Sequence, residues 1–136
     1  MIRHGLKIGI DYRGTASQLG GCIADSESWK ALFSPICNGG LLKLQEQNAT
    51  KRNIVDAIKA IAAVCPRGSD HEFLITFSGH GTYRAGATGE ADGRDEALCC
   101  FDYQRNGLLW DNELAVLLEG SQGLFITDCC HSHTLT

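Results

Sequence analysis

The feature that most constrains the fold is a run of five apolar or β-branched residues, Phe73-Leu-Ile-Thr-Phe77, that leads straight into Ser78-Gly-His-Gly81. A strand with large side chains on both faces needs cover on both sides, as central strands of mostly parallel sheets have. We therefore expect this strand near the middle of a sheet covered by helices. The sequence also predicts that His80, between two glycines, lies at its carboxyl end.

The rest of the chain alternates between strand and helix patterns. Strands are predicted at 6–11, 41–44 and 124–127, and helices at 24–33, 51–64 and 111–119. Thr50 is a suitable N-cap for the second helix, whereas the polar segment 82–94 is predicted to be a surface loop. This alternation predicts right-handed crossovers, and hence an α/β fold: a three-layer α/β/α sandwich with a mostly parallel sheet.

Composition limits the function classes. The chain has 136 residues, which suits one domain, and its 43% hydrophobic and 21% charged residues are typical of globular proteins. A net charge of −4 weighs against a nucleic-acid partner, and no apolar run is long enough to cross a membrane. The seven cysteines are odd in number and no export signal precedes them. We therefore expect reduced thiols and a cytoplasmic protein.

Two segments carry chemically useful side chains. His80 follows the central strand, and Cys130 follows the last predicted strand about fifty residues later. The carboxyl ends of parallel strands meet at one edge of a sheet, so this pair is expected to lie together. An imidazole can activate a thiol and later protonate a leaving amine, and the amides of Gly81 and Cys130 are candidate donors to an oxyanion.

Each residue alone has a simpler interpretation. A cysteine at the end of an apolar strand is more often an inert buried thiol, and a lone histidine is more often an ordinary loop residue. The joint pattern is much rarer, because it requires a strand leading to a glycine-flanked histidine and a second strand leading to a cysteine at this spacing. The pattern therefore favours a cysteine-histidine hydrolase.

These motifs resemble those of the metacaspases and orthocaspases. Phe77-Ser-Gly-His-Gly81 is similar to the family's histidine motif, Asp128-Cys-Cys-His-Ser132 to its cysteine motif, and Gly20-Gly-Cys-Ile-Ala-Asp25 to a segment after its first strand. The resemblance implies a caspase-hemoglobinase fold and an endopeptidase that cleaves after arginine or lysine. Residues 1–136 would form one large, p20-type catalytic domain, with the small p10-type part absent.

The expected substrate preference agrees with the acidic residues near the two motifs. Carboxylates bind a guanidinium or ammonium group well, so Asp25 and Asp128, with the Ser78 hydroxyl, are the predicted substrate-binding residues. Asp25 has a second interpretation as a charge that favours a helix start. The expected ligand is a peptide or protein substrate with a basic residue before the scissile bond.

The resemblance also implies calcium activation, although the chemistry itself requires no cofactor. Asp95 and Asp111 match acidic positions of that site, whereas Asn112 stands where a second aspartate is common. Calcium prefers six to eight oxygen ligands, more than these residues supply.

Three departures from the family pattern keep other functions open: Cys129 replaces a serine, His133 a glycine and Cys100 a proline. One alternative is a non-catalytic or incomplete fragment that binds a small subunit or self-associates through a sheet edge. Another is a zinc site, which would draw on Cys99, Cys100, Cys129, Cys130, His131 and His133.

Overall fold

The computed structural model describes residues 1–85 and 94–131, without the side chains of residues 85, 94, 130 and 131. The elements are, in chain order, β1 Ile2–Gly9, α1 Cys22–Phe33, β2 Leu41–Gln45, a 3₁₀ turn Glu46–Asn48, α2 Lys51–Val64, β3 His71–Ala85, β4 Arg94–Leu98, α3 Tyr103–Asn106, β5 Leu109–Trp110, α4 Asp111–Leu117 and β6 Gly123–His131. No helix in these ranges is long and apolar enough to span a membrane.

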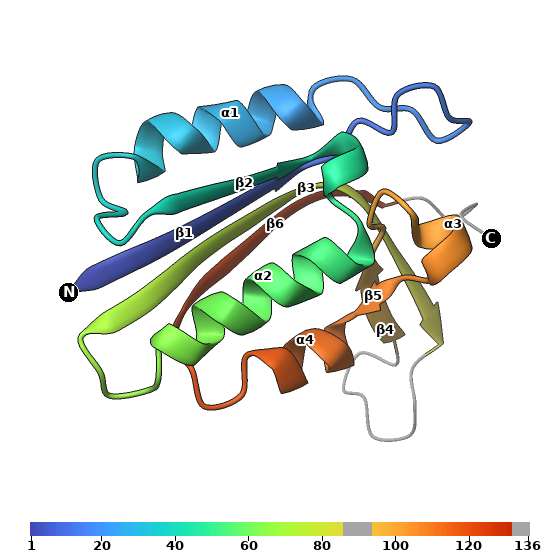
Figure 1. Cartoon of the computed structure of the whole chain (residues 1–136). Coiled ribbons are helices and arrows are strands. Elements are labelled where there is room, and N and C mark those ends of the chain that lie inside the picture. The colour runs from blue at the N-terminus through green and yellow to red at the C-terminus, as the bar shows by residue number, and fades with distance from the viewer. Residues whose placement is uncertain (86–93, 132–136) are drawn as a thin grey trace.

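Strand β3 is the centre of the sheet. It pairs in parallel with β1 and with β6, and its last part pairs with β4 in the antiparallel direction. Helix α1 covers one face of the sheet, whereas α2 and α4 lie on the other (Figure 1). The predicted three-layer α/β/α sandwich with a mostly parallel sheet is therefore confirmed.

The main core lies between the sheet and α2. Leu6, Ile8, Ile75 and Phe77 are fully or almost fully buried there, and Ile58 of α2 is completely buried against this cluster. Helix α2 has the predicted bounds because its apolar residues recur at helical spacing. Its predicted N-cap is also confirmed.

The face of β1 and β3 under α1 is more polar. Lys7, Thr76 and Ser78 are buried in these strands, and Ser26 of α1 is completely buried as well. Gly9 lets the helix approach, because a Cβ at this position would lie 2.7 Å from the Ser26 Cβ. This polar layer leads along β3 toward His80.

The predicted ends of three strands were wrong. The first strand, predicted at 6–11, spans Ile2–Gly9. β3 does not stop at Phe77 but continues to Ala85, and β6 continues to His131. The predicted loop 82–94 is therefore wrong at 82–85 and at 94, which lie in strands, and its remainder, 86–93, lies outside the described residues. Strands β3 and β6 continue into polar segments because backbone hydrogen bonds to neighbouring strands hold these segments extended. Such segments lack the hydrophobic pattern by which a strand is predicted from sequence.

Candidate active site

The two chemically rich motifs lie side by side on neighbouring strands. The parallel register of β3 and β6 pairs Ser78 with Asp128, Gly79 with Cys129, His80 with Cys130, and Gly81 with His131. Hydrogen-bonded strands are about 4.8 Å apart, so the backbones of His80 and Cys130 are direct neighbours. The structure thus brings together the two segments that the sequence suggested, within the strands rather than in loops beyond them.

The His80 ring is held at one of its two nitrogens. Nε2 lies 2.7 Å from the carbonyl oxygen of Ser17. A carbonyl oxygen can only accept a hydrogen bond, so Nε2 carries the proton and the neutral ring has its lone pair at Nδ1. Nδ1 is buried and has no hydrogen-bond partner among the described residues. The ring therefore has a fixed tautomer with a free base at Nδ1.

Tyr12 contacts both the backbone and the ring of His80. Its hydroxyl accepts a hydrogen bond from the His80 backbone N–H at 2.9 Å and donates one to the Cys99 carbonyl oxygen at 2.5 Å. The two rings lie 4.8 Å apart between centroids. Burial raises the pKa of the Tyr12 phenol above its ordinary value, so the hydroxyl stays protonated and can serve as both donor and acceptor.

Sequence reasoning missed both Tyr12 and Ser17. Each touches His80 across more than sixty positions of the chain, and Ser17 does so through its backbone carbonyl. Any residue could supply this backbone carbonyl, so the residue type gives no sign of the contact. The position of Tyr12 directly after the first predicted strand, 6–11, was the one available signal, and it is not specific.

The predicted substrate-binding residues differ in exposure. Asp128 and Asp25 are exposed, on β6 and in the first turn of α1 respectively, whereas Ser78 is completely buried. Ser78 is in register with Asp128, but among the described residues no hydrogen bond or ion pair joins Asp25 to either of them. Two carboxylates are thus accessible to a cationic ligand, and the serine hydroxyl is not.

Gly81, the predicted oxyanion donor, lies inside β3 with strand partners on both sides. Its register partners are Leu98 of β4 and His131 of β6. A small pocket next to it is lined by Glu96, Asp111, Thr127 and Cys129, among other residues. Cys129 is partly exposed.

Cys99 and Cys100, two of the cysteines of the zinc hypothesis, are buried. Burial raises the pKa of the Cys99 and Cys100 thiols to about 12, which disfavours the thiolate that a metal ligand needs. In the part of the chain that the structure describes, no three His, Cys, Asp or Glu side chains form a metal-binding group. His133 and the side chains of Cys130 and His131 lie outside that part. These findings give the zinc hypothesis no support.

The predicted calcium residues have unequal surroundings. Asp95 is 3% exposed, and its Oδ2 accepts a hydrogen bond from Arg84 Nε at 3.3 Å, while its Oδ1 has no partner within the described residues. Both Asp111 oxygens accept backbone N–H groups, those of Glu96 and Asn112. One buried free carboxylate oxygen suits a cation, but the residues described do not complete a calcium site.

A mostly parallel sheet with a glycine-flanked histidine beside a cysteine on the next strand defines the class of caspase-like cysteine peptidases. Comparison with known proteins agrees, since residues 3–136 match the family model for the metacaspase, peptidase C14 domain. The chain therefore belongs to the metacaspase family of cysteine peptidases.

The chain is also similar to individual metacaspases and to a solved structure. Metacaspase-3 of Arabidopsis thaliana is 33% identical over 144 residues, which cover 93% of this chain and 39% of that protein. Metacaspase-1 of Saccharomyces cerevisiae is 28% identical, covering 98% of this chain and 34% of that protein. The crystal structure of a Geobacter sulfurreducens protein has a TM-score of 0.76 and 31% identity, covering 99% of this chain and 53% of that one. The chain thus spans less than two fifths of these metacaspases.

Proposed function

We propose that the chain is the catalytic part of a cysteine endopeptidase in which Cys130 is the nucleophile and His80 the acid and base. The observation that carries this proposal is the register of β3 and β6, which pairs the two residues on adjacent strands. Nδ1 of His80 supports it, because a general base needs an available lone pair and this nitrogen has no hydrogen-bond partner among the described residues.

The reaction follows from these groups. His80 Nδ1 takes the thiol proton, the Cys130 sulfur attacks the peptide carbonyl carbon, and the carbonyl oxygen becomes an oxyanion that the amides of Gly81 and Cys130 would stabilise. The C–N bond then breaks as the imidazolium returns its proton to the leaving amine, which leaves a thioester. Water, deprotonated by Nδ1, hydrolyses the thioester and restores the thiol. The Ser17 carbonyl oxygen accepts the Nε2–H hydrogen bond throughout these steps and so holds the orientation of the ring.

We further propose that the substrate carries arginine or lysine before the scissile bond. The exposed carboxylates of Asp128 and Asp25 support this preference because they are available to a cation. Ser78 would contribute its hydroxyl only if the site opens, because it is fully buried here.

The test is cleavage of fluorogenic peptides that differ only in the residue before the bond. We expect the arginine and lysine peptides to be cleaved and the aspartate peptide to be left intact. Cys130→Ala should abolish cleavage, whereas its neighbour Cys129→Ala should retain it within about threefold, a factor that corresponds to less than 1 kcal/mol. Equal loss from both substitutions would contradict the assignment of the nucleophile.

Calcium activation is a separate proposal that rests on Asp95. The supporting observation is its buried Oδ1, which has no hydrogen-bond partner within the described ranges. Asp111 would be the second ligand, with further oxygens from outside those ranges. Calorimetric titration with calcium tests this directly. Asp95→Asn should abolish binding, and a titration without heat for the unaltered chain would refute the proposal.

A second candidate function is that of an incomplete catalytic part that binds a small subunit. It is favoured by Leu124 of β6, an apolar residue that is 53% exposed. Strand addition along β6 is the expected mode, for a small subunit or for a second copy. Cleavage that appears only when a small subunit is added would favour this candidate, whereas full activity of the chain alone would exclude it.

A further inference from the structure

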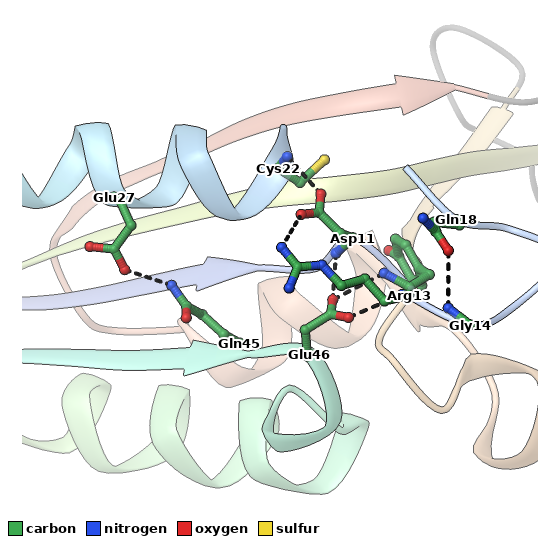
Figure 2. Close-up of polar contacts among 9 residues, drawn as sticks. Asp11, Arg13, Gly14, Gln18, Cys22, Glu27, Gln45 and Glu46 are labelled. Carbon is green, nitrogen blue, oxygen red and sulfur yellow. Dashed lines mark hydrogen bonds and ion pairs between the residues drawn. The ribbon is translucent and has the colours of Figure 1, made fainter. Parts of the chain in front are cut away.

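The Glu46 carboxylate holds the start of the loop that follows β1. Glu46 Oε1 accepts hydrogen bonds from the backbone N–H groups of Asp11 at 2.5 Å and Tyr12 at 3.0 Å, and Oε2 accepts one from Arg13 at 3.0 Å. Figure 2 shows the Glu46 side chain against this stretch of backbone. Three successive N–H groups around one carboxylate form a strong, charge-assisted arrangement.

Two backbone features show that this arrangement overcomes local strain. Glu46 and Tyr12 are the described non-glycine residues with positive φ, at 50° and 54°. Residues other than glycine, asparagine and aspartate disfavour the left-handed region of backbone conformation, so contacts with surrounding residues must hold Glu46 and Tyr12 in it. The two strained residues are joined by the hydrogen bond from Tyr12 N to Glu46 Oε1.

The loop that Glu46 holds makes both contacts that fix His80. Tyr12 bonds the His80 backbone through its hydroxyl, and Ser17 bonds the ring at Nε2 through its carbonyl. Thr15 connects the two, because its hydroxyl donates to the Tyr12 carbonyl at 2.6 Å and accepts from Ser17 N at 3.2 Å. A continuous set of short contacts therefore runs from Glu46 to His80.

We propose that Glu46 is a positioning residue for His80. It does not touch the reacting atoms. By holding the backbone at Asp11–Arg13 it keeps the Ser17 carbonyl against Nε2, which fixes the tautomer and leaves Nδ1 as the base. This inference rests on the proposed catalytic role of His80 for its effect on rate, but its effect on the ring does not depend on activity.

The test compares Glu46→Gln with Glu72→Gln as a matched control. Glutamine keeps the size but replaces one acceptor with an NH₂ group, which cannot accept from a backbone N–H. Glu72 is also partly buried, and it pairs with Arg3 at 2.6 Å near the opposite end of β3 from His80. The two variants lose the same charge, but Glu46→Gln alone disturbs the loop beside His80.

Two measurements are made on the full chain. Nitrogen NMR of the histidine ring should show a single Nε2–H tautomer for His80 in the unaltered chain and in Glu72→Gln, and a mixture of tautomers in Glu46→Gln. In peptide cleavage, kcat of Glu46→Gln should fall by roughly ten- to a hundredfold with KM within about twofold, as expected when a catalytic group is misplaced. Glu46→Asp, which keeps the carboxylate, should give intermediate values by both measurements.

The outcomes separate this inference from the proposed function. A folded Glu46→Gln with an unchanged tautomer and unchanged kcat overturns the inference, whether or not the chain cleaves peptides. A chain that cleaves nothing but shows the Glu46-dependent tautomer supports the inference and removes the proposed function. Should Glu46→Gln fail to fold, Glu46→Asp decides, because a single undisturbed tautomer in that variant would overturn the inference.

Discussion

At the scale of single residues, Gly79 is fixed by packing rather than by backbone conformation. A Cβ at this position would lie 2.8 Å from the Tyr12 hydroxyl and 3.1 Å from two ring carbons of Phe77. Tyr12 is 1% exposed, and its hydroxyl is engaged on both sides by His80 and Cys99. The Tyr12 ring therefore cannot move aside without breaking its contact with His80. Gly79 leaves the space that Tyr12 needs to make this contact.

Gly79→Ala should consequently harm both stability and activity. Overpacking of a closed site costs about 1–3 kcal/mol in the free energy of unfolding, which urea denaturation measures. The displaced Tyr12 should also reduce kcat for peptide cleavage. Gly20→Ala is the control, since Gly20 has open space around its Cβ position and no positive φ. Equal stability of the two variants would show that the site relaxes freely.

The residues that the sequence could indicate were those that carry chemistry by type. His80 and Cys130 stand out because glycines and acidic residues surround them at the ends of apolar runs. Tyr12, Ser17 and Glu46 could not be found in this way, because their roles depend on contacts between distant parts of the chain, some of them through the backbone. Such contacts follow from the fold and not from any local pattern.

At the scale of elements, an ion pair links β1 to α1 across a polar layer. Lys7 Nζ lies 3.1 Å from Glu27 Oε1, and the Lys7 side chain is 2% exposed whereas that of Glu27 is 43% exposed. Gln45 of β2 donates to the same Glu27 oxygen at 2.8 Å, as Figure 2 shows. These contacts, the Gln45 hydrogen bond first and Lys7 next, lower the pKa of the Glu27 carboxyl. A buried ammonium thus depends on one carboxylate at the surface.

Removing the two partners should therefore have opposite effects. Glu27→Gln leaves the buried ammonium of Lys7 without a countercharge and should lower the urea midpoint of unfolding. Lys7→Met removes the buried charge and should leave the midpoint unchanged or raise it, because buried ion pairs are often replaced by apolar residues without loss. The double variant should match Lys7→Met. A Glu27→Gln chain as stable as the unaltered one would refute this account of the pair.

Element types were easier to predict than strand ends. The helix over 51–64 follows from its N-cap and apolar periodicity and has the predicted bounds, and the helix predicted over 24–33 begins two residues earlier, at Cys22. β4 and β5 were not predicted, because Arg94–Leu98 is largely polar and Leu109–Trp110 has two residues. Their pairing with the extended end of β3 defines them, and that extension itself was not visible in the sequence.

At the scale of the whole molecule, ionisable groups are part of the main core. Tyr12, Cys65, Cys99 and Cys100 belong to the same buried cluster as the apolar side chains of β1, β3 and α2. Burial raises the pKa of each of them. The core therefore tolerates these groups only while they are protonated, and folding as a whole is linked to pH.

Stability should fall in alkaline solution for this reason. Burial raises the pKa of these thiols in the folded state above the ordinary value of 9.0, to about 12. Their contribution to the free energy of unfolding is therefore complete below pH 9 and is lost as the pH rises toward 12. Between these limits the unfolded chain releases protons that the folded chain keeps, which costs about 1.4 kcal/mol per thiol for each pH unit. Urea unfolding at pH 8, 9 and 10 measures the slope. The double variant Cys99→Ala/Cys100→Ala retains every other titrating group, so its slope should be shallower than that of the unaltered chain, and parallel slopes would show that these thiols are not linked to folding.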